Sequence, residues 1–292
     1  MAAPADPRRS AHPAVAAWRR LIASPVARVG LVIVLGFFLM AVMTPLLHRY
    51  DAKTDANLTL RLKPPTLAHP FGTDTLGRDL VVRVLHAAPV TLGLAVSAVA
   101  VAALVGSLIG LVAGYLGERT DIVLMFGMDI LLAFPGTLLA IAIVAMMGPG
   151  LRNSLFAISL VSIPAYARLS RAAVLSLREQ EFVVAARGMG GSGARVLLGH
   201  IVPNSLPPLI VQTTLAVAFA ILEAAALGFL GLGAQPPTPE WGAMLADSYK
   251  YFTSGAWWVF LFPGAAIMLS VLGFNLLGDG LRDALDPRLG ES

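Results

Sequence analysis

The chain has 292 residues, of which 57% are hydrophobic and only 13% are charged. A soluble domain usually carries about 25% charged residues, so this composition indicates an integral membrane protein. The net charge is +4 and the basic residues are scattered at segment ends, which argues against nucleic-acid binding. The absence of cysteine excludes disulfides, cysteine-ligated iron–sulfur clusters and thiol catalysis.

The N-terminal segment, residues 1–28, is rich in alanine, proline and arginine, and we expect it to be a disordered or surface-lying cytoplasmic tail. A secretory signal is the competing interpretation. The apolar segment 29–47 that follows is too long for the hydrophobic part of such a signal and lacks a convincing cleavage site. It is therefore predicted to be an uncleaved first transmembrane helix.

Residues 48–87 are predicted to form a polar extracytoplasmic loop. Gly72, Asp74 and Gly77 indicate turns within it. The segment Asp79–Leu85 is expected to be a short amphipathic helix that lies at the membrane interface.

Five further apolar segments follow, and each is long enough to cross a hydrocarbon core of about 30 Å. They run approximately over 89–115, 122–147, 154–175, 206–232 and 257–277. The chain is therefore predicted to be an all-α polytopic membrane protein with six transmembrane helices. Residues 88–282 would form a five-helix core domain, and residues 283–292 a cytoplasmic C-terminal tail.

Six crossings place both termini and the polar stretch 176–208 on one side of the membrane. More than half of the lysine and arginine residues lie on that side. The positive-inside rule therefore assigns this side to the cytoplasm.

Two acidic residues fall inside the predicted spans, Asp129 in the third and Glu223 deep in the fifth. An aspartate at the centre of a membrane helix costs roughly 2.5–3.5 kcal/mol, so such residues usually face a cavity or a partner. Each is expected either to line a substrate path or to join two helices, and both interpretations stay open. Pro135 and Pro164 are expected to kink the third and fourth spans.

Aromatic residues between the last two spans are expected to anchor the chain at the membrane–water interface. They are Trp241, Tyr249, Tyr251, Trp257 and Trp258.

The stretch 176–208 is polar, basic and rich in glycine. Ser176 with Glu179 three residues later is a capping-box pattern and predicts a helix that begins there. The glycine run 188–193 cannot sustain a helix, because each glycine costs roughly 1 kcal/mol relative to alanine. A second short helix over 194–201 is predicted to end before Pro203. This cytoplasmic helix–turn–helix is either a docking element for a soluble partner or an ordinary loop.

The pair Ala185–Ala186, then Gly190, then Ile201 and Pro203, resembles the EAA coupling loop of ABC importer permeases. The glutamate of that family's pattern falls on Val184 in this chain. Glu181, one helical turn earlier, could supply an acid on the same side. Glu181, Arg187 and Arg195 are the candidate polar contacts to a partner.

Three other stretches resemble the dipeptide, oligopeptide and nickel branch of these permeases. They are residues 71–83, with Phe71–Asp74, Leu76–Asp79 and Arg83, then 222–233 and 278–288. That branch commonly carries an arginine where this chain has Pro89.

The resemblance implies a multi-pass subunit of the bacterial cytoplasmic (inner) membrane that works by alternating access. It also implies four kinds of contact: a second homologous permease, two cytoplasmic ATPase subunits, an extracytoplasmic substrate-binding protein and the lipid bilayer. Di- or oligopeptides are the expected substrates, and nickel chelates, glutathione-like peptides and other small solutes stay open.

No catalytic, cofactor or metal site is predicted in the chain. A phosphate-binding loop requires a Gly-Lys pair, and none of the lysines, Lys53, Lys63 and Lys250, follows a glycine. ATP is therefore expected on partner subunits. The rival function is a stand-alone ion-coupled secondary transporter that uses Asp129 and Glu223 as ion sites.

Overall fold

The computed structural model of the chain describes residues 13–47, 50–51, 55–251, 253 and 255–285. Within these ranges the only β-structure is an isolated bridge between Thr73 and Asp79. The α-helices are α1 (Pro13–Ala23), α2 (Pro25–Leu47), α3 (Leu80–Leu116), α4 (Glu118–Leu132), α5 (Gly136–Met147), α6 (Leu151–Leu177), α7 (Glu181–Gly188), α8 (Gly193–Val196), α9 (Val202–Phe229), α10 (Trp241–Ser248) and α11 (Trp258–Leu285). Leu58–Leu60 and Tyr249–Tyr251 form 3₁₀ turns, and Leu197–Ile201 forms a π-helical turn.

Five helical segments are each long and apolar enough to cross a membrane: α2, α3, α6, α11 and the continuous segment from α8 to the end of α9. The helices α4 and α5, which are bent by 86° relative to each other, pass the same test only as a pair, and they bring the number of crossings to six if the pair is one span. The predicted all-α membrane fold is therefore confirmed with five or six crossings, and the segment predicted as a kinked third helix is broken into two. Pro135, which lacks a backbone N–H, lies at the break, as the residue directly before α5.

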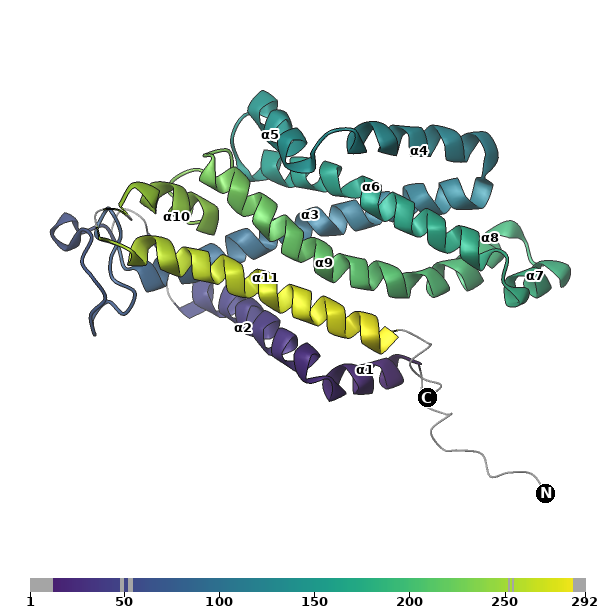
Figure 1. Cartoon of the computed structure of the whole chain (residues 1–292), viewed down its shortest axis with the longest axis horizontal. Coiled ribbons are helices and arrows are strands. Elements are labelled where there is room, and N and C mark those ends of the chain that lie inside the picture. The colour runs from purple at the N-terminus through teal and green to yellow at the C-terminus, as the bar shows by residue number, and fades with distance from the viewer. Residues whose placement is uncertain (1–12, 48–49, 52–54, 252, 254, 286–292) are drawn as a thin grey trace, which may run out of the picture.

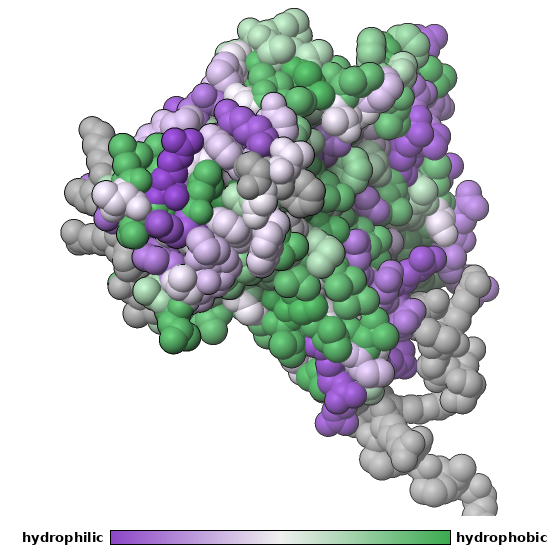
Figure 2. All heavy atoms as spheres, turned by 60° about the vertical axis from the view of Figure 1, so that its left-hand side comes forward, coloured by the Kyte–Doolittle hydropathy of each residue, from purple (hydrophilic) through white to green (hydrophobic). Residues whose placement is uncertain are grey.

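The long helices run side by side, and the two ends of the molecule differ (Figure 1). The helices α1, α7 and α8 and the last residues of α11 lie at one end, as an even number of crossings requires. The loop 55–79 and α10 lie at the other end. Figure 2 shows hydrophilic residues gathered over the loop end and hydrophobic residues over the sides of the helices, as expected for a bundle in lipid.

The contact between α3 and α6 is the centre of the bundle. Gly106, Gly110 and Gly114 lie one helical turn apart on α3, and they bring the backbone of α3 against α6. The hydroxyl of Ser170 on α6 donates a hydrogen bond of 3.0 Å to the carbonyl oxygen of Ser107 on α3. Small residues and interhelical hydrogen bonds of this kind join helices in lipid, where no hydrophobic effect drives their association.

Residues 13–23 of the predicted N-terminal tail form the helix α1, so this part of the tail is not disordered. Leu21 is buried and packs near Gly280 of α11, while Trp18 is exposed. Residues 1–12, and residues 286–292 of the predicted C-terminal tail, lie outside the described ranges.

The interfacial helix predicted over 79–85 is instead the first turn of the second crossing. Asp79 caps α3, because its Oδ1 accepts hydrogen bonds from the backbone N–H groups of Val81 and Val82 at 2.8 and 3.2 Å. The helix then continues through Pro89 without a break. The crossing therefore begins nine residues earlier than its apolar run, since a capped first turn needs no continuous hydrophobicity.

Two of the five aromatic residues expected at the interface are core residues. Trp241 is fully buried, and its Nε1 donates a hydrogen bond of 3.0 Å to the carbonyl oxygen of Val84. Trp258 is also buried, and its Nε1 donates to the carbonyl oxygen of Thr73 at 3.1 Å. A buried tryptophan is stable where its N–H finds a partner. Tyr249 and Trp257 are exposed.

Candidate functional site

A compact elbow, defined here as residues 178–201, joins α6 to α9 and lies at the end of the bundle opposite α10 (Figure 1). It consists of α7, a glycine-rich turn, α8 and the π-helical turn. The capping-box prediction was wrong: α6 continues through Ser176 to Leu177, and α7 begins only at Glu181 with Gln180 as its N-cap. The apolar contacts of α6 continue as far as Val174, which is buried, and they outweigh the local capping signal.

A small hydrophobic cluster holds the elbow in place, separate from the main core. Its buried members are Val174, Val183, Ala186, Val196 and Ile201. They come from α6, α7, α8 and the π-helical turn, so burying them fixes the two arms of the elbow to each other and to the bundle.

Tyr115, near the end of α3, adds two polar contacts to this attachment. Its hydroxyl donates a hydrogen bond of 2.9 Å to the carbonyl oxygen of Gly193. The guanidinium carbon of Arg187 lies 5.9 Å from the centroid of the same ring, within the range of a cation–π contact. The elbow therefore rests on α3 as well as on α6.

The turn between α7 and α8 is a Schellman motif. Gly190 has φ of +85°, and its N–H bonds the carbonyl of Arg187 at 3.0 Å, while the N–H of Gly191 bonds the carbonyl of Ala186 at 3.1 Å. This pair of bonds closes a helix at a left-handed residue, a conformation that glycine adopts without the cost that a side chain adds. The glycine run was correctly predicted to end the first helix.

The second arm does not end at Pro203. The segment α8, the π-helical turn and α9 form one continuous helix from Gly193 to Phe229. Pro203 lies inside this helix, directly after the π-helical turn Leu197–Ile201, and local adjustments of this kind accommodate a proline within a membrane helix. At 1.5 Å per residue, this helix is about 55 Å long. The elbow is therefore the end of a membrane helix and not a separate loop.

The seven predicted coupling residues fall into two groups. Ala186 and Ile201 are buried in the cluster that attaches the elbow, whereas the others face outward. The outward group is Glu181, Ala185, Arg187, Gly190 and Pro203. Glu181 has no ion pair with any residue that the structure describes, which leaves its carboxylate available.

Apolar side chains on the outer face of the elbow were missed in the sequence. They are Phe182, Val184, Met189 and Leu198, and Met189 is 83% exposed. Val184, at the position of the family's glutamate, is on the same exposed side as Glu181. The sequence could have indicated them, because α7 contains more apolar residues than fit on its one buried face, which consists of Val183 and Ala186.

Two ion pairs join α4 to α6 along one face of the bundle. Asp129 accepts a hydrogen bond from Arg168 at 2.7 Å, and Asp121 accepts two from Arg171, both at 2.5 Å. The side chains of Arg168 and Asp129 are 55% and 57% exposed, and the four residues line a cavity of about 540 Å³. Asp129 therefore joins α4 to α6 and also borders this cavity. Its place on a substrate path stays a prediction.

Glu223 lies away from the ion pairs between α4 and α6. It is buried on α9, and its Oε1 accepts a hydrogen bond of 2.6 Å from the hydroxyl of Thr137 on α5, while its Oε2 has no partner among the described residues. Among the described residues Glu223 and Asp129 have different hydrogen-bond partners, Thr137 and Arg168. In the part of the chain that the structure describes, no three histidine, aspartate or glutamate residues gather as a metal site would require.

Comparisons with known proteins agree on one family. Residues 106–291 match the model of the binding-protein-dependent transport system inner membrane component, and residues 13–65 match that of the N-terminal TM domain of oligopeptide transport permease C. The chain is 50% identical to the dipeptide transport system permease protein DppC of Alkalihalophilus pseudofirmus, over 97% of this chain and 94% of the relative.

Two further relatives carry related names. The di/tripeptide transport system permease protein DppC of Pseudomonas aeruginosa is 46% identical over 93% of this chain and 91% of its own. The glutathione transport system permease protein GsiD of Pectobacterium atrosepticum is 43% identical over 93% and 90%. Among solved structures, the inward-facing MetNI methionine ABC transporter matches with a TM-score of 0.50 and 19% identity, over 67% of this chain and 94% of that one, a likeness of fold.

Proposed function

The chain belongs to the binding-protein-dependent transport system inner membrane components, the permease subunits of ABC importers. On that premise we propose that it moves small peptides across the bacterial cytoplasmic membrane by alternating access. The named substrates of its relatives, dipeptides, tripeptides and glutathione, are short chains of linked amino acids. This shared chemistry favours small peptides over nickel chelates.

The observation that carries the mechanism is the attachment of the elbow to α9. The outer face of the elbow is free for a partner, its inner face is locked to α3 and α6, and α8 continues into α9 without interruption. A soluble ATPase that grips the outer face can therefore move α9 and the residues it carries, including Glu223. Rigid elements transmit such displacements because packed cores deform little.

This arrangement supports a proposal for the partners and for the orientation in the membrane. The elbow, α1 and the end of α11 would face the cytoplasm, where one of two ATPase subunits grips Phe182, Val184 and Met189. The loop 55–79 and α10 would face outward, where a substrate-binding protein delivers the peptide.

A second homologous permease would cover the face formed by α4 and α6. The Asp129–Arg168 pair lies open on that face, and charges exposed to hydrocarbon are costly. Ile122, Val123 and Phe126 of α4 are exposed beside it. A partner helix would bury these apolar side chains and would enclose the charged pairs in a water-filled path between the two subunits.

Reconstitution tests the proposal. The permease pair in liposomes should take up labelled dipeptide only when both ATPases, ATP and the binding protein are present. Uptake by the permeases alone, driven by an ion gradient, would instead support the stand-alone transporter. In the same assay Glu223→Gln should lower the uptake rate at unchanged protein level, and an unchanged rate would remove Glu223 from the path.

A further inference from the structure

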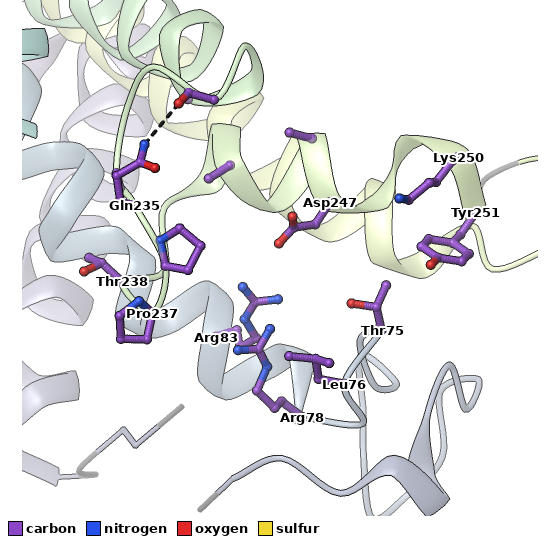
Figure 3. A pocket seen from close by; sticks show the side chains of 16 residues that line it. Thr75, Leu76, Arg78, Arg83, Gln235, Pro237, Thr238, Asp247, Lys250 and Tyr251 are labelled. Carbon is purple, nitrogen blue, oxygen red and sulfur yellow. Dashed lines mark hydrogen bonds between the residues drawn. The ribbon is translucent and has the colours of Figure 1, made fainter. Parts of the chain in front are cut away.

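A half-enclosed cavity of about 510 Å³ lies at the loop end of the molecule, far from the elbow. Three segments surround it: residues 75–83 before and within α3, residues 228–238 at and after the end of α9, and the helix α10 with the 3₁₀ turn that follows (Figure 3). Its volume falls in the range of small-molecule sites, roughly 300–1,000 Å³.

The floor of the cavity contains a buried excess of positive charge. Arg78 Nε and Arg83 Nη1 both donate to the same oxygen of Asp74, Oδ2, at 2.7 Å, and all three side chains are at most 8% exposed. The other oxygen of Asp74 accepts the backbone N–H groups of Leu76 and Arg78. Two guanidinium groups therefore share one carboxylate that has no capacity left.

Arg83 has an unused donor. Its Nε is buried and has no hydrogen-bond partner among the described residues. A buried charged group whose N–H donor has no acceptor is energetically costly, and a bound anion that accepts this hydrogen bond removes the cost. Of the common anions, a carboxylate matches the planar donor edge of a guanidinium best, because it can accept two parallel hydrogen bonds.

The opposite wall carries the opposite charge. Figure 3 shows the carboxylate of Asp247, on α10, across the cavity from Arg78 and Arg83. Asp247 is exposed and makes no hydrogen bond or ion pair within the described ranges. The neighbouring cation, Lys250, lies 5.8 Å from the ring centroid of Tyr251 instead. The cavity thus presents donors on one side and a free acceptor on the other.

We propose that this cavity binds a zwitterionic solute of dipeptide size, with its carboxylate on Arg83 and Arg78 and its ammonium group on Asp247. It would be an entry site on the outer face, used before the solute reaches the path between the permeases. This inference rests on the proposed function, which places the cavity on the outer face of the membrane and makes a peptide the solute. A protruding acidic side chain of a partner protein would use the arginines but would leave Asp247 and most of the enclosed volume unfilled.

The test is equilibrium binding to the assembled permease–ATPase complex in lipid nanodiscs, without ATP and without the binding protein. Labelled alanyl-alanine should bind saturably. Arg83→Gln and Asp247→Asn should each weaken binding at least tenfold. Asp283→Asn, an exposed acid on α11 at the other end of the molecule, is the matched control and should bind as the native complex does.

Competition separates the possible ligands. Unlabelled alanyl-alanine should displace the label, whereas its C-terminal amide and its N-acetyl derivative should each be at least tenfold weaker competitors. Acetate that competes as well as the dipeptide would show a simple anion site and would overturn the proposal. No saturable binding, or equal loss in Asp283→Asn, would also overturn it.

Two further points keep the test decisive. Arg83 is part of a buried network, so Arg83→Gln can fail to assemble, but Asp247 is exposed and unbonded, so Asp247→Asn alone decides the outcome in that case. Binding is measured without ATP turnover. If no binding is found, the proposal of ATP-driven uptake is not contradicted. If no uptake is found, the binding result still holds.

Discussion

Gly110 of α3 and Ala167 of α6 meet backbone to backbone: a Cβ placed on Gly110 would lie 2.2 Å from the carbonyl oxygen of Ala167. The glycines one turn to either side, Gly106 and Gly114, are in similarly close contact with α6. At these three positions α3 carries no side chain, so its backbone approaches α6 directly. Because α6 leads into the elbow and α3 supports it through Tyr115, this crossing sets the base on which the elbow rests.

Replacing Gly110 with alanine should destabilise the protein, because the added methyl group forces the two backbones apart. The expected cost is about 1–3 kcal/mol, as for other overpacked sites. Gly93→Ala is the matched control on the same helix, where a Cβ would meet nothing within 4 Å. The control should be neutral or gain up to about 1 kcal/mol from helix propensity. Melting temperatures in detergent compare the two, and equal values would contradict the close crossing.

Gly190→Ala should reduce ATP-driven uptake without removing the protein from the membrane. The cost is conformational, since φ of +85° is unfavourable for alanine by roughly 1–2 kcal/mol, although a Cβ there has open space. The control is Gly188→Ala, at the end of α7, which also has open space and has no positive φ. Limited proteolysis should show a loosened elbow in Gly190→Ala only. The same cleavage rate in both variants would argue against the Schellman turn.

The exposed apolar residues of the elbow lead to a prediction about the partner. Met189→Ser should leave the melting temperature unchanged but should reduce co-purification of the ATPase, since interfaces bury such side chains. The control is Leu67→Ser, at a fully exposed apolar residue in the loop at the opposite end, and this variant should keep the ATPase. A loss of ATPase from both variants would point to a general defect instead of a docking surface.

Much of the architecture was readable in the sequence, because hydrophobic length sets the number of crossings and glycine sets the position of the elbow turn. The helix ends were less predictable. Ser176 and Glu179 gave a good local capping signal, but the tertiary contacts of α6 overrode it. Pro203 looked like a stop, yet the helix continues through it directly after the π-helical turn Leu197–Ile201.

The partners of charged and aromatic residues could not be predicted, since they are distant in the chain. Asp129 and Arg168 are 39 residues apart, and Trp241 bonds a carbonyl 157 residues away. Composition showed that these groups were present, but only the packing of α4 on α6 and of α10 on α3 shows which of them meet. The glycines of α3 could have been found, because their spacing of four is visible in the sequence.

The pair of Arg168 and Asp129 should behave as a coupled unit. Arg168→Gln leaves an unpaired carboxylate on a membrane-crossing helix, so the amount of protein in the membrane should fall. Adding Asp129→Asn should restore part of that loss, because residues in one ion pair show non-additive effects. Immunoblots of membranes from the two single variants and the double variant measure the effect. Additive losses would show that the two side chains do not interact in the folded protein.

The last prediction concerns Glu240, which is buried and caps α10. Its two carboxylate oxygens accept the backbone N–H groups of Gly242 and Ala243 at 2.9 and 2.8 Å, and Oε1 also accepts from the hydroxyl of Thr91. Burial raises the pKa of the Glu240 carboxyl above its usual 4.5, and the hydrogen bonds to Gly242, Ala243 and Thr91 offset only part of that rise.

The sign of the pH effect follows from this raised pKa. The folded protein holds the proton more tightly than the unfolded chain, so the contribution of the group to stability is fully present below pH 4.5 and is lost as the pH rises through the folded pKa. Glu240→Gln removes the titration and also one acceptor, at a constant cost of about 1 kcal/mol.

The melting temperature of the native protein, minus that of Glu240→Gln, should therefore increase as the pH falls from about 8 to about 5. The subtraction cancels the groups that titrate in both proteins. A difference that stays flat, or that shrinks toward acid pH, would show that the hydrogen bonds outweigh burial and that the carboxylate is held in its charged form.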